Sequence, residues 1–209
     1  MGSDSSSGGP GGKLTSGWAS PSILGLLAFG LMTILLGLLA LPSPYSSGFG
    51  ATPHGISTSF VAVTQMALAV GGLLVIIGVI SLIEGHLYWG SAFLGYGIFW
   101  GSWGWATHHL GFGSGYGEAA FMFLWLMFTL TFLVSSIKHG WATLIAFLFL
   151  FVGIILLLVV AWQTGAGNTI SSGEHWAVGG ELIATGLIWW YGGTAQLTNH
   201  SFAKKFLPV

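Results

Sequence analysis

Long apolar stretches constrain this chain more than any other feature of its sequence. Each is about 20 residues long, which is the length that a helix needs to cross the hydrocarbon core of a bilayer. Only 4% of the 209 residues are charged and 54% are hydrophobic, whereas soluble domains carry about 25% charged residues. We therefore predict an all-α membrane protein, a six-transmembrane-helix bundle. The expected spans are residues 23–41, 60–83, 87–108, 119–137, 141–162 and 175–197.

The distribution of lysines predicts how this bundle is oriented. Residues 1–19 are rich in Gly and Ser and are expected to form a flexible tail, followed by a transmembrane domain over 20–200 and a short tail over 201–209. With six spans, all the lysines fall on one side, and positive charge is retained on the cytoplasmic side. We expect a multi-pass protein of the plasma (inner) membrane with both termini cytoplasmic. The lysines are Lys13, Lys138, Lys204 and Lys205.

Several classes of function are disfavoured by the composition. The chain has no cysteine, which excludes disulfides and thiolate metal sites. A net charge of -1 argues against a nucleic-acid partner. There is no arginine to clamp a carboxylate with two hydrogen bonds. Because no nucleophile, base dyad or cofactor motif appears, we predict a protein that is not an enzyme and needs no cofactor or metal.

The third expected span alternates glycines with aromatic residues. A helix built only to sit in lipid would be rich in Leu, Ile and Val, so this composition suits a helix that lines a narrow path. Tyr96 places a phenol in this span and could donate one hydrogen bond to a passing carboxylate. Trp100, Trp103 and Trp105 follow and are candidates for contacts between protomers. The 35 glycines offer more close-packing surface than six helices need among themselves, which favours a homo-oligomer.

Motifs occur in a defined order from the first span to the C-terminus. The first span carries Pro21-x-x-Leu24-Gly25-Leu26-x-x-Phe29-Gly30-x-x-Thr33, and the third carries Ala92-Phe93-x-x-Tyr96-Gly97-x-Phe99-Trp100. The others are Gly71-Gly72 with Gly78, Leu124-Trp125-x-x-Phe128-Thr129 followed by Lys138, Ala166-Gly167-Asn168, and Asn199 with Leu207-Pro208-Val209. Together these motifs resemble the acetate uptake transporter (AceTr) family over nearly all the chain beyond the tail.

This resemblance implies a six-helix protomer, a homohexamer in the membrane lipid, and one pore per protomer. The pore would carry a small carboxylate anion, acetate foremost with succinate as a further candidate, either passively or coupled to protons. The resemblance also implies a narrow ring of Phe29, Tyr96 and Leu150, of which Leu150 matches only by counting on from Lys138. It places substrate binding near the start of the first helix, at Pro21, Leu24, Gly25, Leu26 and Thr33.

The chain departs from the family pattern at polar positions. Ser20, Ser22 and Ile23 stand where the family has Asn, Ala and a second Pro, and Leu74 stands where it has Gln. Ser20 can nevertheless cap the first helix. Because the lost amides could have contacted a substrate, a channel for a small neutral solute such as urea or an amide stays open as an alternative.

Two further sets of ionisable residues leave other functions open. Glu181 lies about two turns into the sixth span, on the same face as Glu174, and is a candidate for carrying a coupled proton. Seven histidines occur in the chain, so a haem- or metal-binding membrane subunit is a second alternative. The candidate cluster for a metal is His108, His109 and His175 with Glu118.

Overall fold

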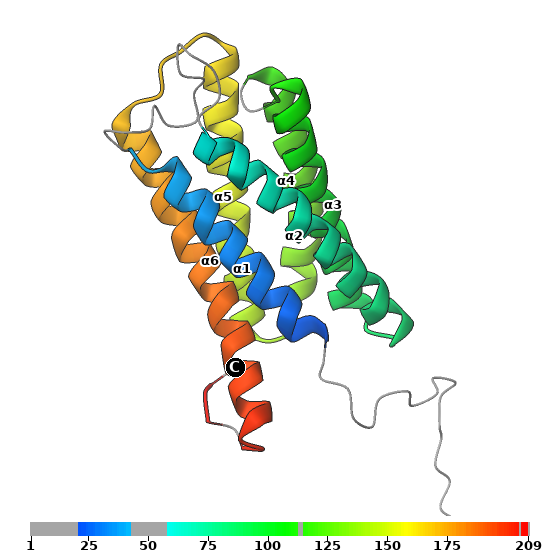
Figure 1. Ribbon diagram of the computed structural model, residues 1–209. Helices are drawn as coiled ribbons and strands as arrows, with labels where there is room; N and C mark the ends of the chain where they lie inside the picture. The colour runs from blue at the N-terminus through cyan, green and yellow to red at the C-terminus, as the bar shows by residue number, and fades with distance from the viewer. Residues whose placement is uncertain (1–20, 43–57, 113–114, 205, 209) are drawn as a thin grey trace, which may run out of the picture.

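The protein is an all-α bundle. The computed structural model describes residues 21–42, 58–112, 115–204 and 206–208. Consecutive helices run in opposite directions, and the end of the last helix lies at the end of the bundle where the first begins (Figure 1). We call this the N-terminal end of the bundle. The helices are α1 (Pro21–Ala40), α2 (Thr58–Ile83), α3 (Leu87–Leu110), α4 (Tyr116–Ser136), α5 (Trp141–Gly165) and α6 (Ser172–Ser201), which confirms the predicted fold class.

Four of the helices are long and apolar enough to cross a membrane. These spans are Pro21–Ala40, Val61–Ile83, Tyr116–Ser136 and Trp141–Gly165. The sequences of α3 and α6 are richer in Gly, Ser, Thr and His and therefore less apolar. With 24 and 30 residues they are still long enough to cross a hydrocarbon core of about 30 Å at about 1.5 Å per residue.

The helix ends are fixed by local chemistry. Gly85 and Gly140 adopt positive φ values of 86° and 103° in the tight turns before α3 and α5, a conformation that favours glycine. At the start of α6, the Ser171 hydroxyl accepts a hydrogen bond from the Glu174 amide at 3.2 Å, while the Glu174 carboxylate accepts one from the Ser171 amide at 2.8 Å. The Ser171 hydroxyl also donates to the Glu174 carboxylate at 2.7 Å. This bond, and after it the one from the Ser171 amide, holds the pKa of Glu174 below its ordinary value. Glu174 therefore serves as a cap.

Glycines let specific helix pairs approach closely. The most intimate pairs are α2 with α3, α1 with α6, and α4 with α5. A methyl group added at Gly30 of α1 would lie 2.5 Å from the backbone nitrogen of Trp190 in α6, and one added at Gly97 of α3 would lie 2.6 Å from the backbone nitrogen of Val75 in α2. These glycines therefore serve contacts within the protomer and give no support to a homo-oligomer. That expectation rests on the family resemblance.

The tryptophans of α3 do not all lie where the sequence suggests. Trp100 and Trp103 are 2% and 1% exposed inside the protomer, so the idea that they contact a neighbouring protomer is wrong. They point inward because α3 packs against α2 and also touches α1. Trp105, at 48% exposed, is on the outer face.

Candidate functional site

The residues proposed to form a constriction converge inside the bundle. Phe29, Tyr96 and Leu150 come from α1, α3 and α5, each near the middle of its helix, and are 3%, 3% and 5% exposed. All three line one cavity of about 20 Å³. The ring centroids of Phe29 and Tyr96 lie 5.1 Å apart. A cavity of this size has room for about one water molecule and for no larger solute.

The rest of this small cavity lies beyond Phe29, away from the N-terminal end of the bundle. Among the described residues, no charged side chain lines it. Its walls are apolar: among the described lining residues Tyr96, Thr33 and Trp100 carry polar side-chain atoms, but these atoms do not open onto the cavity. The remaining lining residues are Leu36, Phe99, Ile154, Leu157 and Leu182.

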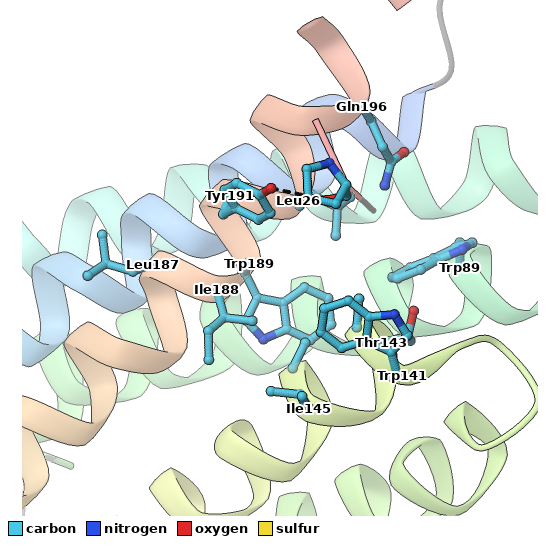
Figure 2. A pocket seen from close by; sticks show the side chains of 14 residues that line it. Leu26, Trp89, Trp141, Thr143, Ile145, Leu187, Ile188, Trp189, Tyr191 and Gln196 are labelled. Atoms are coloured by element: carbon cyan, nitrogen blue, oxygen red, sulfur yellow. Dashed lines mark hydrogen bonds between the residues drawn. The ribbon is translucent and has the colours of Figure 1, made fainter. Parts of the chain in front are cut away.

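A larger cavity of about 360 Å³ lies on the other side of Phe29, towards the N-terminal end. Leu26, one turn before Phe29 in α1, forms part of its wall, and Trp89, Trp141 and Trp189 come from α3, α5 and α6 (Figure 2). Its polar lining includes Thr143, Tyr191 and Gln196. The Tyr191 hydroxyl donates a hydrogen bond to the Pro208 carbonyl at 3.0 Å, drawn as the dashed line in Figure 2.

Phe29 lines the small cavity, and its ring packs against one tryptophan from each cavity. Its ring centroid lies 6.3 Å from that of Trp100, which lines the small cavity, and 5.2 Å from that of Trp189, which lines the large one. Trp189 also packs edge-on against Phe147, with centroids 4.9 Å apart. The sequence-based prediction did not include Trp100 or Trp189 as pathway residues, and nothing in the sequence distinguishes Trp189 from its neighbour Trp190.

The hydroxyl of Tyr96 is already hydrogen-bonded. It lies 2.9 Å from the hydroxyl of Thr129 in α4. The Thr129 hydroxyl donates its single hydrogen to the Trp125 carbonyl at 2.8 Å. Tyr96 must therefore be the donor to Thr129. Its proton is not free for a passing carboxylate, contrary to what the sequence suggested.

The predicted substrate-binding residues at the start of α1 do not form one group. Leu26 lines the large cavity and Thr33 the small one, where its hydroxyl donates to the Phe29 carbonyl at 2.8 Å. Leu24 faces outward at 51% exposed, and Gly25 lies against the ring of Phe93. Pro21 begins the helix. The capping residue Ser20 lies outside the described residues.

Glu181 lies at the contact between α6 and α5. One carboxylate oxygen accepts a hydrogen bond from the Thr185 hydroxyl at 2.7 Å. The other is buried, has no hydrogen-bond partner among the described residues, and faces Gly153 of α5. Its neighbour Leu182 lines the small cavity, whereas Glu181 does not.

Two of the residues suggested for a metal site, Glu118 and His175, are engaged elsewhere. Glu118 is 6% exposed and accepts a hydrogen bond from the Trp103 indole at 3.2 Å. His175 lies 3.2 Å from the Ala40 carbonyl. Within the described part of the chain, no three His, Asp or Glu side chains gather in a way that could hold a metal ion. One further histidine, His54, lies outside that part.

Comparisons with known proteins agree with this architecture. The model of the GPR1/FUN34/yaaH family matches residues 12–208. An uncharacterized protein of Methanothermobacter thermautotrophicus is 31% identical over 209 residues, covering 91% of each chain. A solved structure, that of the bacterial acetate channel SatP, superimposes with a TM-score of 0.70 at 24% identity, covering 92% of this chain and 99% of that one. This chain therefore belongs to the GPR1/FUN34/yaaH family, the acetate uptake transporter family that its motifs indicate.

Proposed function

We propose that this membrane protein carries a small monocarboxylate, acetate foremost, along a path through each protomer. The observation that carries the proposal is the convergence of Phe29, Tyr96 and Leu150 on one narrow cavity, with a wider cavity towards the N-terminal end of the bundle. Support also comes from the family and from the structural likeness to a bacterial acetate channel.

The physical basis of selection is size and dehydration. Apolar rings that leave room for about one water strip most of the hydration from a solute, which opposes the passage of large or multiply charged ions. A two-carbon monocarboxylate fits such a passage better than a larger anion and costs less to dehydrate than a multiply charged one. Succinate, the further candidate, is longer and carries two charges when fully ionised, so the same selection predicts slower passage for it than for acetate.

The test is uptake of labelled acetate into liposomes containing the purified protein. We expect saturable uptake by the wild type and altered rate or selectivity for Phe29→Ala and Leu150→Ala. Phe123→Ala and Leu148→Ala are matched controls because these side chains are 52% and 46% exposed on the outer face. Wild-type uptake no greater than that of empty liposomes would overturn the proposal. Uptake of urea or acetamide without acetate would instead favour the neutral-solute alternative.

Proton coupling is the finer part of this proposal, with Glu181 as the candidate. Its buried, unpartnered oxygen is a position at which a proton could reside. If Glu181 carries the coupled proton, Glu181→Gln will abolish the stimulation of uptake by an inward proton gradient while uptake without a gradient persists. Stimulation that survives in Glu181→Gln would leave Glu181 with a packing role only.

The assembly and orientation are proposed on separate grounds. The family resemblance supports a homohexamer, which native mass spectrometry in detergent would test. Lys138 and Lys204 both lie at the N-terminal end of the bundle, which supports placing that end in the cytoplasm, in the plasma (inner) membrane. Protease protection of a C-terminal tag in right-side-out vesicles would test the orientation.

A further inference from the structure

The constriction needs a hydrogen-bond donor for a carboxylate, and Tyr96 does not supply a free one. A carboxylate that enters an apolar passage loses its water partners, and this loss is costly unless the protein replaces them. Tyr96 and Thr33 both direct their protons at protein oxygens, at Thr129 and at the Phe29 carbonyl. Among the described lining residues of the small cavity, that leaves the indole of Trp100, whose N–H group has no partner but does not open onto the cavity here, so it would reach a substrate only when the cavity widens.

Two buried indole N–H groups flank the constriction without partners. The Nε1 atoms of Trp100 and Trp189 are buried and make no hydrogen bond among the described residues. The residues are 2% and 4% exposed. An indole N–H can only donate, and leaving such a donor buried and unpaired is unfavourable. A substrate that accepts a hydrogen bond from each would remove this cost.

The positions of the two indoles match the two cavities. Trp100 lines the small cavity on one side of Phe29, and Trp189 lines the large cavity on the other, as the close view of that cavity shows (Figure 2). Both rings contact the ring of Phe29. A solute that passes Phe29 therefore leaves the neighbourhood of one unpaired donor and meets the other.

We propose that the indole N–H groups of Trp100 and Trp189 are the hydrogen-bond donors that receive the substrate carboxylate before and after Phe29. The substrate would accept one hydrogen bond on each side, so that its charge is never left wholly unpaired in the apolar passage. The chain has no arginine, so no guanidinium can bind the anion. Neutral donors such as the indoles bind it more weakly, which permits its release. This inference rests on the proposed function and assigns it two residues.

The experiment replaces each indole by a ring without the N–H group. Trp100→Phe and Trp189→Phe are compared with Trp105→Phe and Trp190→Phe, whose side chains are 48% and 38% exposed. The readouts are labelled-acetate uptake in liposomes and acetate binding by calorimetry in detergent. Acetamide uptake is measured beside them, since the neutral amide depends less on a donor. β-(3-Benzothienyl)alanine at each position keeps the shape of tryptophan where the Phe variant fails to fold.

We expect the acetate concentration at half-saturation to rise about tenfold in Trp100→Phe and in Trp189→Phe. A change of this size corresponds to the loss of one hydrogen bond to a charged group. Half-saturation for acetamide should change less than that for acetate, and both control variants should be unchanged. If wild-type acetate uptake is saturable and neither indole variant changes half-saturation, the inference is overturned and the proposed function stands. If the wild type neither binds nor carries acetate, both are overturned.

Discussion

The hydrogen bond between Tyr96 and Thr129 can be tested through an asymmetry that the structure imposes. Both residues are buried, at 3% and 0% exposed, and their hydroxyl oxygens lie 2.9 Å apart. Thr129→Val keeps the shape of the side chain but removes the only acceptor of the Tyr96 proton. Leaving that donor buried and unpaired should cost about 1–3 kcal/mol in the free energy of unfolding.

The reverse substitution should cost less. In Tyr96→Phe the Thr129 hydroxyl keeps its acceptor, the Trp125 carbonyl at 2.8 Å, so that only the net worth of one hydrogen bond is lost, about 0.5–1.5 kcal/mol. In the double variant no donor is left unpaired. The sum of the two single costs should therefore exceed the double cost by about 0.6 kcal/mol, the average for hydrogen bonds between membrane helices, and by at most about 1.7 kcal/mol.

The assay is unfolding by SDS titration in mixed micelles, followed by far-UV circular dichroism at one protein concentration. Thr131→Val is the matched control, because the Thr131 hydroxyl is exposed and bonds only to the Met127 carbonyl of its own helix. It should change the free energy by less than about 0.5 kcal/mol. Additive single costs, or a greater cost for Tyr96→Phe than for Thr129→Val, would refute the assignment of Tyr96 as donor.

Three further predictions concern helix packing, the C-terminal segment and the charge at the contact of α5 and α6. Gly30→Ala should destabilise the protein by about 1–3 kcal/mol in the same titration, because the new methyl group meets the backbone of α6. The control is Gly72→Ala, which should be neutral or stabilising because no neighbouring helix lies within 4 Å of the added group. Asn199→Ala should release the C-terminal segment, since the Asn199 side chain binds three backbone groups of Phe206 and Leu207. Faster carboxypeptidase digestion would show this, and an unchanged rate would contradict it. Glu181→Gln should keep thermal stability within a few degrees, since the amide can still accept from Thr185; a large loss would show that the charged form stabilises the fold.

The helices could be predicted from sequence because lipid permits few alternatives. Apolar stretches of this length form helices since every backbone group must be bonded within the segment. The expected bounds differ from the observed ones where polar residues extend a helix. The sixth span was expected at 175–197, but α6 covers Ser172–Ser201. The capping box of Ser171 and Glu174 moves its start outward from the apolar run.

The faces of the helices could not be predicted in the same way. In a soluble bundle, hydrophobic residues mark the buried face, but in a membrane both the core and the lipid face are apolar. Trp189 and Trp190 are identical and adjacent, yet one is 4% and the other 38% exposed. Phe29 and Tyr96 were placed on the path by the family motifs, and their convergence is consistent with that. Trp100, in the same motif as Tyr96, was wrongly assigned to the outer surface because the motif does not show which way its side chain points.

Whether the solute path crosses the bundle at Phe29 is tested most directly by blocking it at one position. The chain has no cysteine, so a single cysteine can be introduced and modified selectively. Leu150→Cys and its control Leu148→Cys are treated with benzyl methanethiosulfonate, which makes the side chain bulkier than leucine, and labelling is verified by mass spectrometry before acetate uptake is measured. The account predicts that modification at position 150 stops uptake and modification at 148 leaves it unchanged. Full labelling at 150 with undiminished uptake, or no labelling there while acetate passes, would contradict it.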